Sequence, residues 1–240
     1  WCCTSKLRSV ATFAYPCSLL LGSLLLVARR KDDCMTDQKP ITTQINGRVG
    51  ILRFNRPQVM NAFDTALIEA TNQAMHDFMA DDAVLAIIIG GHGRCFSAGF
   101  DMKESAARGI RGQDEWRKVL TKDFDFIMQF WHAPKPTIAA AHGYCIGGAM
   151  ELLMACDLSV ASETTLFGEP EVRFGSGIVA MLAPYVIGPK QAKELLLTGN
   201  DRVSAQRCYE MGILNRVTAE GGEMDAAMAL AQQITSAAPR

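Results

Sequence analysis

A glycine-rich segment that ends in a glutamate is the first part of this sequence that could carry out chemistry. Residues 143–151 read Gly-Tyr-Cys-Ile-Gly-Gly-Ala-Met-Glu and follow an apolar run over 137–141 that predicts a strand. A helix predicted to begin near Gly147 would present its unpartnered first N–H groups to a carbonyl oxygen that gains negative charge. Glu151 lies one turn further along among apolar residues, where a carboxylate is costly unless it is paired or used. A glycine turn with a structural ion pair is the alternative interpretation.

Two other segments repeat parts of this pattern. Residues 96–101, Phe-Ser-Ala-Gly-Phe-Asp, place small residues between a buried strand predicted over 85–89 and a second helix start. Residues 167–171, Phe-Gly-Glu-Pro-Glu, follow another short strand, and Pro170 restricts the backbone between the two carboxylates. Taken singly, the first segment is more often an ordinary strand-to-helix turn and the second a solvated acidic loop.

The elements that must position these segments alternate between strands and helices. Asn46-Gly47 between two alternating apolar runs predicts a hairpin over 41–54, and Asp64 is expected to cap a helix that runs to about Ala80. The remaining strands are expected at 85–89, 137–141, 158–161, 166–168 and 213–217, and the remaining helices at 114–130, 147–156, 176–187, 189–198, 204–211 and after Gly222. This order predicts an α/β domain.

Composition limits the class of protein. The 240 residues carry 24 basic and 25 acidic side chains, a net charge of −1, and 49% of them are hydrophobic. These values exclude a disordered chain and argue against a nucleic-acid surface, which needs an excess of basic side chains. Four cysteines are far apart in the sequence, so we expect buried free thiols in a reducing compartment and a cytoplasmic location. They are Cys95, Cys145, Cys156 and Cys208.

The first 34 residues differ from the rest. They contain five basic and two acidic side chains, whereas residues 35–240 carry a net charge of −4. An uncharged stretch over 10–28 with basic flanks is compatible with a signal peptide or a membrane anchor. Because the chain begins with Trp1 and Met35 resembles an ordinary start, we favour residues 1–34 as translated upstream sequence outside the domain. Residues 35–240 are then the domain, for which we expect no membrane contact and a C-terminus cut short after a helix.

The three segments described first, together with Asn55-Arg56-Pro57 and Asn61-Ala62, resemble the enoyl-CoA hydratase/isomerase (crotonase) superfamily. The resemblance extends from about Ile41 to Thr235, and its four separated motifs occur in the order of the family. It implies an α/β fold, a crotonase-like spiral of repeated ββα units with a helical C-terminal part. It also implies homotrimers or hexamers that bind acyl-CoA, with no cofactor apart from the coenzyme A of the substrate.

Residue roles are carried over from this resemblance. The main-chain N–H groups of Phe100 and Gly148 match the family's oxyanion hole, and Glu151 and Glu171 match the two catalytic glutamates of its hydratases. The substrate and coenzyme A channel of the family matches Ala62, Ala98, Asp101, Met102 and Gly147.

The resemblance therefore implies an enoyl-CoA hydratase-like lyase. Glu151, with a pKa raised by its apolar surroundings, would help to activate water, and Glu171 would exchange the α-proton. A Δ3,Δ2-enoyl-CoA isomerase, which can work with one carboxylate, is the alternative. Hydrolases, dehalogenases and decarboxylases of the superfamily use the same hole with other side chains.

The sequence departs from the hydratase pattern at three places. Residues 176–181, Ser-Gly-Ile-Val-Ala-Met, replace the proline- and glycine-rich loop of many hydratases. Phe100 is bulkier than the alanine often found there, although only its main-chain N–H is needed. Glu169 adds a third carboxylate, which could pair with Arg173 or shift the pKa of Glu171.

A metal site is the main rival interpretation. His92 with Cys95, and His142 with Cys145, form two His-x-x-Cys pairs, and zinc sites use such ligands at short spacings. Each pair ends a predicted buried strand at a glycine turn, so we predict no metal ion. The sequence also has neither the three-glycine pattern of a dinucleotide site nor the Gly-x-Ser-x-Gly pattern of a serine esterase.

Overall fold

The computed structural model describes residues 39–175 and 177–237. The chain is divided between Trp1–Gln38 and Lys39–Arg240, so the predictions for residues 1–34 and for the uncharged stretch over 10–28 lie outside the described residues. Within the two described ranges, no helix is both long enough and apolar enough to cross a bilayer.

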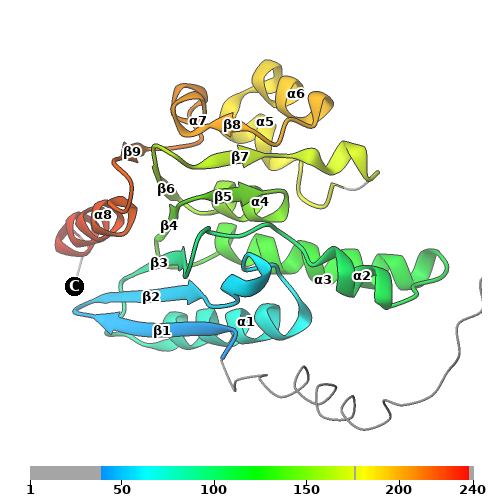
Figure 1. The fold of residues 1–240 in the computed structure, drawn as a ribbon. Helices are drawn as coiled ribbons and strands as arrows, with labels where there is room; N and C mark the ends of the chain where they lie inside the picture. The colour runs from blue at the N-terminus through cyan, green and yellow to red at the C-terminus, as the bar shows by residue number, and fades with distance from the viewer. Residues whose placement is uncertain (1–38, 176, 238–240) are drawn as a thin grey trace, which may run out of the picture. The chain divides into compact units, whose positions relative to one another are not determined.

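A six-stranded sheet forms the framework of Lys39–Arg240 (Figure 1). Its strands lie in the order β1 (Ile41–Asn46), β2 (Val49–Phe54), β3 (Ala86–Gly91), β4 (Thr137–Ala141), β6 (Leu158–Ser162) and β9 (Arg216–Thr218). The predicted hairpin is confirmed, because β1 pairs antiparallel with β2 and Gly47 has the positive φ of 59° that its turn requires. All other neighbouring pairs are parallel. Each residue of β3 and β4 is buried, as the continuous apolar runs predict.

Helices cover both faces of this sheet. One face contributes to the larger apolar core with α1 (Thr65–Ala80), α3 (Gln113–Trp131) and α4 (Gly148–Ala155). On the other face, Ile88 and Ile138 share a smaller apolar cluster with Ala227 of α8 (Glu223–Ala237). Asp64 caps α1, as predicted, by accepting a hydrogen bond from the N–H of Leu67. The remaining helices are α2 (Met102–Ala107), α5 (Leu182–Ile187), α6 (Pro189–Thr198) and α7 (Ala205–Met211), with short 3-10 helices η1 (Pro57–Val59) and η2 (Pro170–Arg173).

A second, smaller sheet consists of β5 (Tyr144–Ile146), β7 (Leu166–Gly168) and β8 (Val203–Ser204). The sequence predicts a turn that leads straight from Gly143 into a helix, so β5 is a correction. Cys145 pairs with Phe167 of β7 on one side and forms a bridge with Ser97 on the other. Tertiary pairing on both sides makes this short segment a strand, where local propensity alone gives no signal.

A unit of two strands followed by a helix recurs along the chain. β4, β5 and α4 follow one another, as do β6, β7 and the helices after it, with the first strand in the large sheet and the second in the small one. This confirms the predicted α/β fold of repeated ββα units with a helical C-terminal part. The helix predicted over 176–187 is wrong at its start, because Gly175 and Gly177 have positive φ angles of 68° and 154° and α5 begins at Leu182.

Candidate functional site

Four chain segments that hold the predicted site residues lie side by side. Residues 60–63 run parallel to residues 98–101. Ser97 forms a bridge with Cys145 of β5, and β5 pairs in parallel with β7, next to each other in the middle of Figure 1. The carboxyl ends of parallel segments meet at one edge, so the residues that follow these segments gather there. They are Phe100, Gly148, Glu169 and Glu171.

Two main-chain N–H groups meet at this edge. The carbonyl oxygen of Gly99 accepts a hydrogen bond from the N–H of Phe63, and the N–H of Asp101 donates to the carbonyl oxygen of Phe63. The N–H of Phe100, between them, therefore points away from Phe63. A Cβ on Gly99 would lie 2.7 Å from the carbonyl oxygen of Ile146 and 3.0 Å from the nitrogen of Gly148. Neither Phe100 nor Gly148 donates its N–H to any other described residue. Both N–H groups therefore remain available to a ligand.

The bulk of Phe100 is accommodated over Gly148. A Cβ on Gly148 would lie 2.5 Å from two carbons of the Phe100 ring, so only glycine fits beneath the ring. The ring also packs edge-on against Phe63 and Phe126, at centroid distances of 5.7 and 6.2 Å. This departure from the family pattern therefore changes the core, while the main-chain N–H remains at the site edge.

Glu151 is a buried acid in the first turn of α4, with 1% of its surface exposed. Its Oε1 accepts a hydrogen bond of 2.8 Å from the N–H of Val179, and the N–H of Ile178 also donates to the carboxylate. Burial, with a smaller effect from the charge of Glu171, raises the pKa of Glu151 to about 7, against the effect of the two N–H donors. The raised pKa predicted from the apolar helix is confirmed. A carboxyl group with such a pKa can both accept and release a proton near neutral pH.

Glu171 reaches back from η2 to the turn before α4. Gly147 has a positive φ of 59°, and Oε1 of Glu171 occupies the space where a Cβ of Gly147 would stand. Burial raises the pKa of the half-buried Glu171, and its Oε2 is buried without a donor from any described residue. The carbonyl oxygen of this same Gly147 accepts a hydrogen bond from the N–H of Glu151, and the charge of Glu171 also raises the pKa of Glu151.

One of the two roles predicted for Glu169, an ion pair with Arg173, is wrong. Arg173 pairs with Asp201, at 3.4 Å between Nη1 and Oδ2, and not with Glu169. Glu169 is instead buried, with 1% exposure, within hydrogen-bonding reach of the carboxyl group of Glu171. Burial first, and then the charges of Glu151 and Glu171, raise the pKa of Glu169 well above its usual range. The contact lowers the pKa of Glu171 against the effect of burial, so the second predicted role, a pKa shift, is confirmed.

The other predicted positions lie at the ends of residues 60–63 and 98–101. They are Ala62, Ala98, Asp101 and Met102. The carboxylate of Asp101 is used within the protein, because it accepts hydrogen bonds from the N–H groups of Lys103 and Glu104 at the start of α2 and lies 3.7 Å from Arg56. Met102 is 60% exposed and remains available to a ligand.

The side chain of Asn61 makes more hydrogen bonds near this edge than the sequence indicates. Its buried Nδ2 donates to the carbonyl oxygens of His92, Cys95 and Phe96, at 2.9, 2.8 and 3.1 Å. Its Oδ1 accepts a 2.8 Å hydrogen bond from the N–H of Arg56. The Asn61-Ala62 motif signals that this position matters, but nothing in the sequence identifies the three carbonyl groups that its side chain binds.

The two His-x-x-Cys pairs use their histidines in other contacts. Nε2 of His92 lies 2.8 Å from Oγ1 of Thr42, and Nε2 of His142 lies 3.0 Å from the carbonyl oxygen of Gly93. Over residues 39–175 and 177–237, no three His, Cys, Asp or Glu side chains are grouped so that they could hold a metal ion. The four cysteines of this part are buried and free, as predicted.

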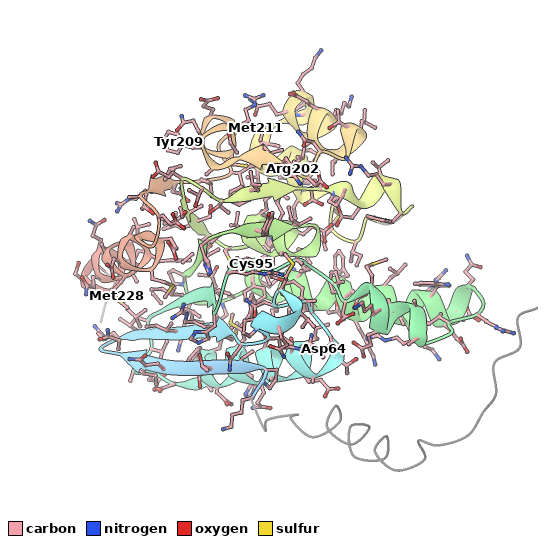
Figure 2. All side chains as sticks on the ribbon, viewed as in Figure 1. Asp64, Cys95, Arg202, Tyr209, Met211 and Met228 are labelled. Atoms are coloured by element: carbon pink, nitrogen blue, oxygen red, sulfur yellow. The ribbon has the colours of Figure 1, made fainter. Side chains whose placement is uncertain are left out.

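A cavity of about 470 Å³ adjoins the loop that binds Glu151. α3 lines it through Trp116, Leu120 and Phe124, and the loop contributes Ile178, whose N–H donates to Glu151. Larger cavities lie elsewhere, one of about 650 Å³ between α1 and α3 and one of about 580 Å³ at α6 and α7. Arg202 and Met211, labelled in Figure 2, line the last of these.

Known proteins resemble this chain in sequence. The family model for enoyl-CoA hydratase/isomerase matches residues 44–240. A mitochondrial enoyl-CoA hydratase of Pongo abelii is 35% identical over 195 residues, which are 80% of this chain and 65% of the relative. A carnitinyl-CoA dehydratase of Salmonella enteritidis is 35% identical over 199 residues, which are 81% of this chain and 74% of the relative. The chain thus spans less than two thirds of the Pongo protein.

Solved structures of this family also resemble the chain in fold. An enoyl-CoA hydratase/isomerase from Xanthobacter autotrophicus Py2 is 46% identical with a TM-score of 0.81, and the match covers 83% of this chain and 74% of that one. An enoyl-CoA hydratase from Bacillus anthracis is 28% identical with a TM-score of 0.76, over 82% of this chain and 77% of that one. With most of its described length matched in both sequence and fold, the chain belongs to the enoyl-CoA hydratase/isomerase family, within the crotonase superfamily.

Proposed function

We propose that this chain catalyses the reversible addition of water to the double bond of a 2-enoyl-CoA thioester. The observation that carries the proposal is the proximity of two acids, Glu151 and Glu171, to the N–H groups of Phe100 and Gly148 at one edge of the small sheet. The names of two relatives, an enoyl-CoA hydratase and a carnitinyl-CoA dehydratase, support a reaction that adds or removes water.

In the proposed reaction the thioester carbonyl oxygen accepts hydrogen bonds from the N–H groups of Phe100 and Gly148. These donors withdraw electron density from the double bond and stabilise the enolate-like charge that forms when water attacks. One such donor is typically worth about 3 kcal/mol in the transition state. Gly148 is the first residue of α4, so the positive end of the helix dipole adds to this stabilisation.

Glu151 and Glu171 divide the proton transfers. During hydration, Glu151 takes a proton from water as the water oxygen bonds to C3, and protonated Glu171 gives its proton to C2. During dehydration, Glu171 takes the C2 proton and protonated Glu151 gives its proton to the leaving hydroxyl group. The pKa of about 7 for Glu151 and the raised pKa of Glu171 support this division, because both groups can gain and lose a proton during hydration and dehydration.

The cavity beside Ile178 supports a place for the acyl tail, because three large apolar side chains of α3 line it, those of Trp116, Leu120 and Phe124. The thioester and the coenzyme A part would then lie along the predicted channel residues, which are Ala62, Ala98, Asp101, Met102 and Gly147. The proposal includes no cofactor apart from the coenzyme A of the substrate.

We further propose a homotrimer or a dimer of trimers in the cytoplasm. Apolar side chains around η2 and α5 support a subunit interface, because Phe174, Met181 and Tyr185 are 64, 52 and 81% exposed. Light scattering during size-exclusion chromatography tests the assembly, and a monomer would overturn it. Cell fractionation tests the location, which the buried free thiols support.

The ultraviolet absorbance of the 2-enoyl thioester measures the proposed reaction directly. We expect absorbance to fall with the wild-type protein and kcat to fall about 10²-fold or more with Glu171→Gln, which cannot exchange the proton. Glu163→Gln is the matched control, because Glu163 is exposed on the turn after β6. Full activity in Glu171→Gln, or no hydration by the wild type, would contradict the proposal.

A 3-enoyl-CoA substrate separates hydratase from isomerase. An isomerase would move the double bond without adding water and could retain activity with one acid. We expect the loss of either Glu151 or Glu171 to lower the rate of hydration about 10²-fold or more, since each carries one proton transfer. Rapid conversion of 3-enoyl-CoA in the absence of hydration would favour the isomerase instead.

A further inference from the structure

Glu169 is a buried acid to which the proposed reaction gives no role. It lies next to Glu171 in the chain, separated only by Pro170, and 1% of its surface is exposed. Neither of its carboxyl oxygens receives a hydrogen bond from any described donor. A carboxylate in that position would lose its hydration without compensation, so a neutral acid fits the site better than an ion.

Other acids surround Glu169. Glu171 on η2 lies within hydrogen-bonding reach, Glu151 on α4 is close enough to interact by charge, and the thiol of Cys145 on β5 also lies near. Arg173, the basic side chain of this segment, is paired with Asp201. Since no base pairs with Glu169 among the described residues, a proton shared between neighbouring carboxyl groups is the remaining way to stabilise them.

The geometry indicates which acid holds the proton. Oε1 of Glu171 lies against Gly147, towards the site edge, whereas Oε2 is buried and has no donor. Glu171 is half-buried and Glu169 fully buried, so the negative charge costs less on Glu171. We infer that Glu169 is a protonated carboxylic acid that donates a hydrogen bond to Oε2 of Glu171 and so positions Glu171 as a carboxylate.

This arrangement makes Glu169 a positioning residue for the α-proton transfer, and only that role rests on the proposed function. With Oε2 engaged, Oε1 remains as the oxygen that takes the C2 proton during dehydration. The donated hydrogen bond favours the ionised form of Glu171, and so opposes the burial that raises its pKa. The proton of Glu169 stays on Glu169, so the balance of the reaction is unchanged.

Two substitutions at Glu169 separate a hydrogen-bond donor from a space-filling side chain. Glu169→Gln retains a hydrogen-bond donor, as an N–H in place of the O–H. Glu169→Leu removes the donor and fills a similar space with an apolar side chain. For dehydration of a 3-hydroxyacyl-CoA, we expect Glu169→Leu to lower kcat about tenfold or more with little change in KM, and Glu169→Gln to stay within about threefold of wild type. The acid limb of the kcat profile should move to higher pH by about one unit in Glu169→Leu only, because Glu171 has lost its donor.

A purely structural role for Glu169 would lower activity equally at every pH. An unchanged pH profile in a folded Glu169→Leu variant, or a Gln variant as impaired as the Leu variant, would overturn the inference. Glu163→Gln is the control for removal of one carboxylate elsewhere and should keep the wild-type profile.

Infrared spectroscopy tests the protonation state without any turnover. At alkaline pH, Glu151, with a pKa of about 7, and Asp123, with a pKa of about 6, are ionised, so neither contributes the carbonyl stretch of a protonated carboxylic acid. We expect this band in the wild type and in Glu151→Gln, and its loss in Glu169→Gln. A wild-type protein without the band would overturn the inference. A protein that shows the band but does not hydrate enoyl-CoA would contradict only the proposed function.

Discussion

Val179 donates its main-chain N–H to Oε1 of Glu151 over 2.8 Å, although the two residues are 28 positions apart in the chain. The bond joins the loop before α5 to the first turn of α4, and the side chain of Val179 is fully buried. This loop departs from the proline- and glycine-rich pattern of many hydratases. Because the donor is a main-chain group, a different loop sequence can still hold the acid.

Replacing Val179 with proline should lower activity by removing this donor. The N–H stabilises the ionised form of Glu151, so its loss should raise the pKa of Glu151 above about 7. We expect kcat for hydration to fall about tenfold, most strongly below neutral pH, where less Glu151 would be ionised to accept the proton of water. Steady-state kinetics over a range of pH measures both effects.

Val179→Ala is the matched control, because it shortens the side chain and keeps the N–H. It should cost about 1 kcal/mol or more of stability through the cavity it leaves, with little shift of the pH profile. If the proline variant is folded and keeps the wild-type profile, the contact does not position Glu151.

The burial of Glu151 also makes the stability of the fold depend on pH. Its pKa rises from 4.5 to about 7 on folding, so the stability that its bound proton provides is complete below pH 4.5 and is lost as the pH rises to about 7. The shift corresponds to about 3 kcal/mol. Since glutamine does not titrate, Glu151→Gln should be more stable than the wild type by up to this amount at alkaline pH, although it should be inactive.

Urea unfolding of the two proteins at acidic and alkaline pH measures this difference. Comparing the two removes the contributions of the titrating groups that do not interact with Glu151, because both proteins share them. Equal differences in the free energy of unfolding at both pH values would show that Glu151 has an ordinary pKa in the folded protein.

Alanine at position 148 should disturb the pair of N–H donors. Its Cβ would lie 2.5 Å from two carbons of the Phe100 ring, so either the ring or the start of α4 must move. Displacing one donor from the thioester oxygen should reduce kcat about 10²-fold to 10³-fold. Kinetics of enoyl-CoA hydration measures the loss.

The ring of Phe100 supplies the control for this prediction. Phe100→Ala keeps the main-chain N–H and should lose less activity than Gly148→Ala, although it also loses packing against Phe63 and Phe126. Combining the two substitutions removes the clash, so the double variant should be more active than Gly148→Ala alone. A double variant no better than Gly148→Ala would mean that the ring is not the cause.

Long periodic segments of this fold are predictable from the sequence, and short paired ones are not. The helix capped by Asp64 and the strand at 86–91 follow from apolar spacing and from a capping side chain, which are local signals. Tyr144–Ile146 becomes a strand only because Ser97 and β7 lie on its two sides. Its partners are separated from it by tens of residues, so no local pattern predicts it.

The same distinction holds for the candidate site. A glutamate in an apolar helix predicts the raised pKa of Glu151, because burial is the main cause of that shift. The N–H of Val179 has no side-chain signature, so its contact with Glu151 depends on the fold. For Glu169, proximity in the chain suggests both Arg173 and Glu171 as partners, and only the direction of each side chain decides between them.

Asn61 provides the last prediction, because one amide group serves three carbonyl oxygens. Asn61→Ala would leave these buried groups unpaired, and we expect a loss of about 2–4 kcal/mol in the free energy of unfolding, measured by urea. The carbonyl groups of Cys95 and Phe96 precede the segment that carries the N–H of Phe100, so kcat should fall as well.

Backbone conformation must be separated from hydrogen bonding in this test, because Asn61 has a positive φ of 53°, which alanine adopts at a cost. Asn61→Gly adopts that φ without strain but cannot donate, so it should lose nearly as much stability as Asn61→Ala. Asn61→Asp would direct a carboxylate oxygen at three carbonyl oxygens and should be the least stable of the three. If Asn61→Gly is instead close to the wild type, the positive φ and not the amide group explains the effect of alanine.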